Sequence, residues 1–203
     1  MIVIRVETPE DRASIDAVTR AAFAQHEHGG RIEASVVAAL RQAGALTLSL
    51  VAEVADVADV ADVADVADGL ASEVAGQAAS PAAGTVVGPV AGHVAFSPVR
   101  VRLADGRVLG GWYGLGPLSV LPSLQRQGIG SKLIRQGLAE SKAQGARGCV
   151  VLGEPAYYHR FGFRSGSGLT AEGLPPAYFM SLAFDGDPPS GTVTYHPAFS
   201  AGD

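Results

Sequence analysis

The sequence predicts an α/β domain, because stretches with helical apolar spacing alternate with short strand-like runs along the chain. Two features make this prediction specific. Asp105 and Gly106 stand between two β-rich runs and form the signature of a hairpin turn. Residues 149 to 152 follow a helical stretch and are wholly apolar, which is typical of a strand that lies parallel to its neighbour. With 203 residues, 47% hydrophobic and 17% charged, the chain suits one domain with a sizeable core.

The N-terminal part predicts two strands separated by two helices. Alternating apolar residues predict the first strand over residues 2 to 6. The segment Thr8-Pro9-Glu10-Asp11 has the pattern of a capped helix start, with an N-cap, a proline in the first helical position and a capping acid. A second helix is expected over residues 31 to 43 and a strand over residues 46 to 53. The expected apolar faces are Ile15, Val18, Ala22 and Phe23 in the first helix and Ile32, Val36, Val37 and Leu40 in the second.

An acidic low-complexity insertion follows over residues 54 to 84. The triplet Val-Ala-Asp repeats five times from Val54 to Asp68, and an Ala/Gly/Pro-rich stretch continues to Gly84. A period of three matches neither a helix nor a strand, so the repeat has no clean apolar face. We expect a loop insertion, mobile or weakly helical, within a single domain of residues 1 to 203. Calcium binding by the row of aspartates is the alternative, but the row lacks the glycine turn and terminal glutamate of known calcium loops.

The C-terminal part predicts a hairpin, a helix and further strands. Residues 85 to 103 are β-rich, with breaks expected at Gly88-Pro89 and Ser97-Pro98, and residues 108 to 120 supply the returning strand. A helix is expected from about residue 128 to residue 144, with Ile129, Leu133, Ile134 and Leu138 on its buried side. The remaining elements are the strand at residues 149 to 152, a short helix beginning at Tyr157-Tyr158, and strands over residues 179 to 184 and 192 to 195.

The composition favours a reducing compartment and excludes several classes of partner. Cys149 is the lone cysteine, and no Cys or His cluster has zinc spacing, so we expect no disulfide and no metal. The first five residues are interrupted by charge too early for a secretory signal, and no run approaches the roughly 18 apolar residues of a membrane span. We therefore expect a cytoplasmic protein that does not associate with membranes.

The net charge of −5 comes from the insertion and the residues just before it. Residues 52 to 84 hold seven acids and no Lys or Arg, and without these acids the formal charge would be +2. The chain has no dense run of Lys and Arg of the kind that a nucleic-acid binder shows. We expect no nucleic-acid partner.

The segment from Leu118 to Ser131 carries the chemistry. It reads as strand, turn, glycine-rich loop and helix, and the first N–H groups of a helix have no internal partner, so they can bind an anion. Arg126 and Lys132 stand near this helix start, and the predicted helix has no Asp or Glu before Glu140. The spacing of Gly128 and Gly130 matches neither a P-loop nor the dinucleotide fingerprint. A tight glycine turn into an ordinary helix stays open as the alternative.

Two motifs together resemble the GNAT superfamily of N-acetyltransferases. Residues 125 to 130, Gln-Arg-Gln-Gly-Ile-Gly, match its Gln/Arg-x-x-Gly-x-Gly/Ala signature, and residues 158 to 163, Tyr-His-Arg-Phe-Gly-Phe, resemble its Tyr-x-x-x-Gly-Phe signature. They are about 30 residues apart with a helix and a strand between them, and the resemblance covers nearly all the chain outside the insertion. The segment Gly153 to Tyr158 is similar to a bacterial branch of predicted acetyltransferases.

This resemblance implies a mixed β-sheet flanked by helices that splays between the strand ending at Val120 and the strand at residues 149 to 152. Acetyl-CoA would lie in the splay as co-substrate, its pyrophosphate on the amides of the loop and its pantetheine paired with the main chain of the preceding strand. The thioester carbonyl would accept from a main-chain N–H near Leu118 or Ser119. The implied cofactor-binding residues are Leu118, Ser119, Val120, Gln125, Arg126, Gln127, Gly128, Ile129, Gly130 and Ser131.

The resemblance also implies a catalytic acid. Tyr158 occupies the position where family members place a tyrosine hydroxyl near the leaving sulfur, and a phenol can lend a proton to a thiolate. The alternative is that Tyr158 only packs against cofactor or core. For the base that takes the amine proton, Glu154 is the first candidate and Glu33 the second.

Other titratable residues are expected to have structural roles. His93 lies in a β-rich segment and is expected to satisfy a local hydrogen bond, and Cys149 is expected in the core. His26 and His28 have no third ligand and suit an exposed loop.

The predicted activity is transfer of an acetyl group from acetyl-CoA to a primary amine of a small molecule or peptide, by direct attack. Two alternatives stay open: a catalytically inactive CoA-binding sensor or interaction module, and an enzyme that uses a longer acyl-CoA or another acceptor atom. The sequence does not name the acceptor, and a homodimer stays open.

Overall fold

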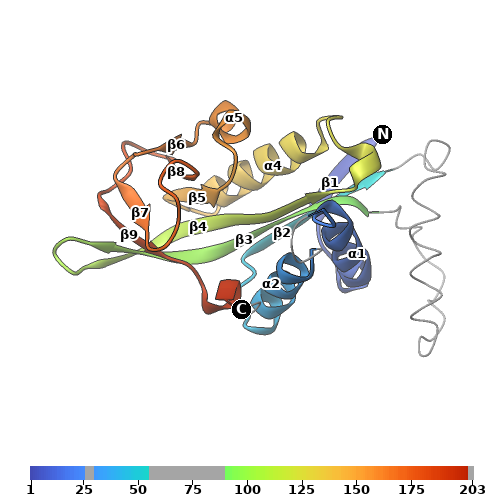
Figure 1. The fold of residues 1–203 in the computed structure, drawn as a ribbon, viewed down its shortest axis with the longest axis horizontal. Helices are drawn as coiled ribbons and strands as arrows, with labels where there is room; N and C mark the ends of the chain where they lie inside the picture. Colours follow the sequence, from blue (N-terminus) through green and yellow to red (C-terminus); the bar gives the residue numbers. More distant parts are fainter. Residues whose placement is uncertain (26–29, 55–89, 201–203) are drawn as a thin grey trace.

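In a computed structural model, residues 1–25, 30–54 and 90–200 are described, and they form one mixed β-sheet of nine strands with helices on both faces (Figure 1). The strand order is β1-β2-β3-β4-β5-β8-β6, with β9 paired to β3 and β7 paired to β9. The strands are β1 (Ile2–Val6), β2 (Leu48–Val54), β3 (Val90–Leu103), β4 (Val108–Val120), β5 (Gly148–Leu152), β6 (Arg164–Ser165), β7 (Leu169–Ala171), β8 (Phe179–Ala183) and β9 (Gly191–Thr194).

The helices form two layers. α4 (Ile129–Ala143) and α5 (Pro155–Tyr158) lie on one face of the sheet, and α1 (Arg12–Ala22) and α2 (Arg31–Gln42) lie on the other (Figure 1). Short 3-10 turns add η1 (Pro9–Asp11), η3 (Pro122–Leu124), η4 (His159–Phe161) and η5 (Pro197–Ser200). The largest fully buried apolar side chains are Phe96, Phe163, Ile15, Leu40, Leu50, Leu133, Ile134 and Met180. These side chains fill the space between the sheet and both helical layers.

The sheet opens between β4 and β5. These strands are parallel, but they pair only from Trp112 opposite Gly148 to Gly114 opposite Val150. Beyond Gly114, β4 continues alongside β3 as far as Val120, whereas β5 continues alongside β8 to its end. The two strands therefore part and leave a wedge at their carboxyl ends, which confirms the predicted splayed α/β fold.

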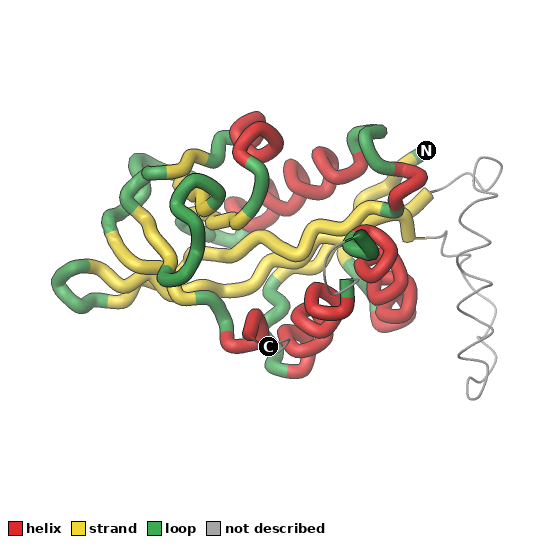
Figure 2. The backbone as a smooth tube through the Cα atoms, viewed as in Figure 1, coloured by secondary structure: helices red, strands yellow, loops and turns green. Residues whose placement is uncertain are grey.

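Several predicted elements are confirmed closely. β4 has the expected bounds, the Asp105-Gly106 turn joins β3 to β4, and the end of this hairpin projects beyond the other strands (Figure 2). The start of the first helix is capped as expected: the main-chain N–H of Thr8 donates to Asp11 Oδ2 at 2.7 Å. Arg5 also pairs with Asp11, at 2.6 Å, and this ties β1 to the helix start.

The expected break at Ser97-Pro98 is wrong. β3 runs through both residues without interruption. One edge of β3 pairs with β2 as far as Phe96 and with β9 from Arg100 onward, so Pro98 lies in the interval where that edge has no partner strand. A residue without an N–H is tolerated at such a place because no ladder hydrogen bond depends on it.

Several further boundaries differ by a few residues or fall outside the described residues. The short helix α5 begins at Pro155, two residues before the expected Tyr157, because Glu154 caps it and proline suits the first helical position. β6 and β7 were not expected. β2 extends to Val54, and residues 55 to 84 of the predicted insertion lie outside the described residues, as does the Gly88-Pro89 break.

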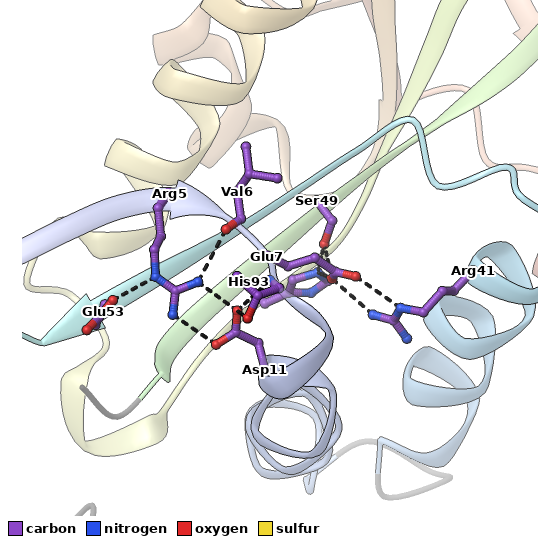
Figure 3. A network of polar contacts seen from close by, with 9 residues as sticks. Arg5, Val6, Glu7, Asp11, Arg41, Ser49, Glu53 and His93 are labelled. Atoms are coloured by element: carbon purple, nitrogen blue, oxygen red, sulfur yellow. Dashed lines mark hydrogen bonds and ion pairs between the residues drawn. The ribbon is translucent and has the colours of Figure 1, made fainter. Parts of the chain in front are cut away.

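A buried polar network joins α2 to the sheet (Figure 3). The Glu7 carboxylate accepts from Nε and Nη2 of Arg41, both at 3.0 Å, and from the hydroxyl of Ser49. The Ser49 oxygen lies 2.8 Å from Nε2 of His93. Since the Ser49 proton points to Glu7, His93 donates through Nε2, and its fully buried Nδ1 has no protein partner. This fulfils the expectation that His93 has a structural hydrogen bond.

We expect this network to make the fold sensitive to mild acid. Burial lowers the pKa of His93 from its ordinary 6.5 to about 4, so between these values the unfolded chain binds a proton that the folded chain does not. Stability is therefore lost as pH falls from about 6.5 to about 4. Between pH 7 and pH 5 the loss attributable to His93 should be about 2 kcal/mol. Urea unfolding at the two pH values measures it.

The variant His93→Gln isolates this contribution, because an amide can still donate to Ser49 but does not titrate. Glu7, whose pKa is lowered by its bonds to Arg41 and Ser49, adds a loss of the same sign at lower pH and is present in both proteins. The variant should lose about 2 kcal/mol less than the wild type between pH 7 and pH 5. An equal loss in both proteins would show that His93 does not titrate as a buried base.

The helix α4 is seated closely on the sheet at Gly137. A Cβ at this position would lie 2.5 Å from Phe96 Cζ, so Gly137→Ala should strain the α4–β3 contact. Allowing for the better helix propensity of alanine, we expect a net loss of about 1–2 kcal/mol in denaturant unfolding. Gly110→Ala is the control, since a Cβ there has no neighbour within 4 Å, and its effect should stay within about 0.5 kcal/mol. A neutral Gly137→Ala would contradict this packing.

Candidate active site

A cavity of about 530 Å³ lies at the open end of the wedge, where β4 leads into α4 and α5 stands opposite. Its walls come from four places in the chain: the end of α1, the end of β4, the loop and first turn of α4, and the α5–η4 segment. The lining residues are Ala22, Phe23, Leu118, Val120, Leu124, Gln125, Arg126, Gly128, Ile129, Gly130, Ser131, Tyr157 and Arg160.

The loop before α4 turns in a way that exposes amides. Arg126 has a φ of 62°, a left-handed conformation that costs a non-glycine residue about 1–3 kcal/mol. Gly128 has a φ of 85° and forms the N-cap of α4. The first helical bond runs from the N–H of Lys132 to the carbonyl of Gly128, so the N–H groups of Ile129, Gly130 and Ser131 precede the ladder. These donors and the positive end of the helix dipole suit an anion.

Gly130 keeps this end of the cavity open. A Cβ there would lie 2.8 Å from the hydroxyl oxygen of Tyr157 and 3.7 Å from side-chain atoms of Leu118 and Val120. A larger side chain at residue 130 would therefore point between α4, β4 and α5. A ligand can approach the main chain of α4 at this point because glycine adds no atoms.

The structure brings most of the sequence-predicted cofactor residues to this cavity. Eight of them line it: Leu118, Val120, Gln125, Arg126, Gly128, Ile129, Gly130 and Ser131. The other two have side chains engaged elsewhere. Ser119 is buried and its hydroxyl donates to Thr19 Oγ1 at 3.2 Å, whereas the Gln127 amide donates to the carbonyl of Ser123 at 3.3 Å. The role expected of Ser119 uses its main chain, which these side-chain contacts do not involve and which lies opposite His93 in the β3–β4 pairing.

The two predicted catalytic residues lie on α5 and at its start. Glu154 is exposed, and its Oε1 accepts from the N–H of Ala156 at 3.4 Å as the helix cap. Tyr158 is half-buried, with its ring edge-on to Phe163 at 6.0 Å and packed over Gly153. Burial raises the pKa of the Tyr158 hydroxyl well above its ordinary value of 10, so this hydroxyl keeps its proton at neutral pH.

Tyr157 and Arg160 are cavity residues that the sequence reasoning missed. Residues three apart on a helical turn share a face, which is how Tyr157 and Arg160 both come to border the cavity. That spacing was the available signal. The two predicted catalytic residues, Tyr158 and Glu154, are not among the cavity's lining residues. The other unexpected lining residues, Ala22, Phe23 and Leu124, come from the end of α1 and from η3, and their proximity depends on the tertiary fold.

The remaining candidates have other positions. Cys149 is fully buried, and burial raises the pKa of its thiol to about 12, so it belongs to the core as expected. Glu33 lies in the first turn of α2 and does not line the cavity. Within residues 1–25, 30–54 and 90–200 no three His, Cys, Asp or Glu side chains gather as metal ligands. His26 and His28 lie outside these ranges.

A second cavity, of about 280 Å³, lies between α1 and α2. Arg12, Asp16, Thr19, Val37 and Arg41 are among its lining residues, and none of the sequence-predicted site residues borders it. The wedge is therefore the site on which the sequence motifs and the geometry agree.

Comparison with known proteins identifies the family. A family model described as an acetyltransferase (GNAT) domain matches residues 82–165. The chain is 34% identical over 162 residues to the Escherichia coli N-acetyltransferase YhbS, covering 80% of this chain and 73% of YhbS. The chain belongs to the GNAT family of N-acetyltransferases. The family membership that the two sequence motifs indicated is thus confirmed.

Two solved GNAT structures share the fold over almost the whole chain. A GNAT family acetyltransferase from Brucella melitensis, in complex with acetyl-CoA, has 44% sequence identity and a TM-score of 0.71, covering 98% of each chain. YhbS from Escherichia coli, in complex with CoA, has 31% identity and a TM-score of 0.72, covering 98% of this chain and 92% of YhbS. The described helices of this GNAT protein include none long and apolar enough to cross a membrane.

Proposed function

We propose that the protein transfers the acetyl group of acetyl-CoA to a primary amine by direct attack, with the thioester held in the wedge between β4 and β5. The observation that carries this proposal is the wedge itself: β4–β5 pairing ends at Gly114, and the cavity beyond it borders the free amides of α4. The cavity and its donors fit a long, phosphate-bearing ligand. The acetyl-CoA and CoA complexes of the two similar GNAT proteins support the same ligand here.

In this proposal the loop residues hold the cofactor and aim its thioester. The amides of Ile129, Gly130 and Ser131 bind the pyrophosphate, and the main chain of Leu118 to Val120 pairs with the pantetheine arm. A main-chain N–H near Leu118 or Ser119 donates to the thioester carbonyl, where negative charge develops as the amine attacks. The chain's contribution to rate is then mainly orientation and charge stabilisation.

Proton transfer completes the reaction. The amine nitrogen forms a bond to the acetyl carbon, the carbon–sulfur bond breaks, and the leaving sulfur takes a proton from Tyr158. Its raised pKa keeps the hydroxyl protonated at neutral pH and makes it a weaker acid than an ordinary phenol, so the proton moves only as charge develops on the sulfur. Glu154 takes the proton that the amine loses, directly or through water, since it is exposed at the start of α5 beside Tyr158. No covalent intermediate with the protein forms.

The acceptor class and the cellular setting are part of the proposal. The acceptor is an amine of a small molecule or a peptide, and no nucleic-acid or membrane partner is proposed. A cytoplasmic location and the absence of a metal rest on the composition and stay predictions. A homodimer stays open.

Steady-state release of free CoA thiol, measured over a panel of primary amines with acetyl-CoA as donor, tests the activity. We expect at least one amine to raise thiol release well above the rate in its absence, with intersecting double-reciprocal lines that indicate a ternary complex. Tight CoA binding without thiol release over a broad panel would instead favour an inactive CoA-binding module. Parallel lines and a trapped acetyl-protein would contradict direct attack.

A further inference from the structure

We infer that Arg160, held in place by the ring of Tyr157, binds a phosphate group of CoA from the α5 side of the cavity. The inference rests on the proposed function and adds to it a second wall for the cofactor, opposite the amides of α4. Neither residue belongs to the glycine-rich loop motif. Both residues line the same cavity as that loop.

The geometry places the guanidinium beside the cradle. The Cζ atom of Arg160 lies 4.9 Å from the centre of the Tyr157 ring, which is cation–π contact. The hydroxyl oxygen of Tyr157 in turn lies 2.8 Å from where a Cβ of Gly130 would stand, so the ring reaches the first turn of α4. Arg160, Tyr157 and the α4 amides therefore border one continuous space.

The charge of the cavity favours an anion. Its lining residues include Arg126 and Arg160 and no Asp or Glu within the described part of the chain. Asp11, which pairs with Arg5, and Glu7, which pairs with Arg41, lie beside α1 and α2 (Figure 3), the helices on the face of the sheet opposite α4 (Figure 1). Besides the ring, Arg160 contacts the carbonyl oxygen of Ala156, which lies 3.5 Å from its Nη2, at the limit of a hydrogen bond. Its guanidinium thus has N–H groups available for a ligand.

Stacking on a ring suits phosphate recognition. A guanidinium that lies over an aromatic face keeps its N–H groups in its own plane, where two of them can bind two phosphate oxygens at once. The ring also limits the conformations of a long, exposed side chain, so less entropy is lost when the phosphate binds. Tyr157 is therefore a positioning residue, and Arg160 is the residue that touches the ligand.

Arg135 provides a matched control on the neighbouring helix α4. Arg135 of α4 also lies over an aromatic ring of the α5–η4 segment, with its Cζ 5.5 Å from the centre of Phe161, and it is exposed like Arg160. Arg135 does not line the cavity. Replacing either arginine by glutamine removes the same charge and the same kind of contact, so only the position relative to the cavity differs.

Isothermal titration with CoA and with 3′-dephospho-CoA, at low and at moderate salt, tests the inference. Arg160→Gln should weaken CoA binding about ten-fold and flatten its salt dependence, whereas Arg135→Gln should change affinity less than two-fold. Tyr157→Phe, which retains the ring, should bind nearly as the wild type does. Tyr157→Leu should weaken binding toward the level of Arg160→Gln, and the double variant should be no weaker than Arg160→Gln alone.

The two cofactors identify the phosphate. A loss seen with CoA but not with 3′-dephospho-CoA assigns Arg160 to the 3′-phosphate, and an equal loss with both assigns it to the diphosphate. Equal affinities of Arg160→Gln and Arg135→Gln, in a wild-type background that binds CoA, would overturn this inference and leave the proposed function standing. A wild-type protein that binds neither cofactor would overturn the proposed function itself.

Discussion

Replacing Gly130 by phenylalanine should weaken acetyl-CoA binding at least about 100-fold, which corresponds to about 2.7 kcal/mol. The new side chain would point into the space bordered by the Tyr157 hydroxyl and the side chains of Leu118 and Val120. It would fill the part of the cavity that the cofactor needs and cover the amides at the start of α4. Isothermal titration with acetyl-CoA measures the loss.

The control for this variant is Gly110→Phe. Gly110 lies near the start of β4, whereas β4 borders the cavity near its end, at Leu118 and Val120. A Cβ at residue 110 has no neighbour within 4 Å, and the residue is exposed. Gly110→Phe should bind acetyl-CoA as the wild type does. Circular dichroism should show the same secondary structure for both variants. Unchanged affinity in a folded Gly130→Phe protein would remove the helix start as the cofactor site.

Replacing Tyr158 by phenylalanine should lower kcat by about 100-fold or more while the affinity for acetyl-CoA stays nearly constant. The hydroxyl is the group expected to protonate the leaving sulfur, and the ring that packs against Phe163 and Gly153 remains in the variant. Because burial raises the pKa of Tyr158, the wild-type rate should show no loss from ionisation of this hydroxyl up to about pH 10. Thiol release with the best acceptor amine, measured from pH 6 to pH 10, gives the comparison.

Tyr178→Phe is the matched control, because Tyr178 lies beside the same segment with an exposed ring and its carbonyl accepts from the N–H of Gly153. Loss of its hydroxyl leaves that main-chain bond intact and should not change kcat. If Tyr158→Phe and Tyr178→Phe both retain the wild-type rate across the pH range, Tyr158 is a packing residue and another group supplies the proton.

The sequence predicts the elements of the site where local chemistry determines them. The Asp105-Gly106 turn and the alternation around it predict β4 with its observed bounds, since this turn lies in the short loop, residues 104 to 107, that separates the two strands. The apolar spacing of α4 likewise predicts that Ile129, Leu133, Ile134 and Leu138 are buried. The glycine-rich loop is readable for the same reason: its conformation depends on residues that are adjacent in the chain.

Features that depend on tertiary neighbours were not predictable in the same way. Pro98 looks like a strand breaker until the change of partner from β2 to β9 is known. β6 and β7 are two and three residues long, too short to show a periodicity. The sequence motif contains Tyr158 and not Tyr157, so it points to Tyr158 alone. Which side chains of α5 share a face depends on where the helix begins, and the capping pair Glu154-Pro155 is the local signal for that start.

The most direct measurement is a crystal structure of this GNAT protein with acetyl-CoA. We predict that the diphosphate oxygens accept hydrogen bonds from the amides of Ile129, Gly130 and Ser131, and that the acetyl group lies between β4 and β5 beyond Gly114, where their pairing ends. A diphosphate bound away from the start of α4, or an acetyl group outside the wedge, would contradict the account.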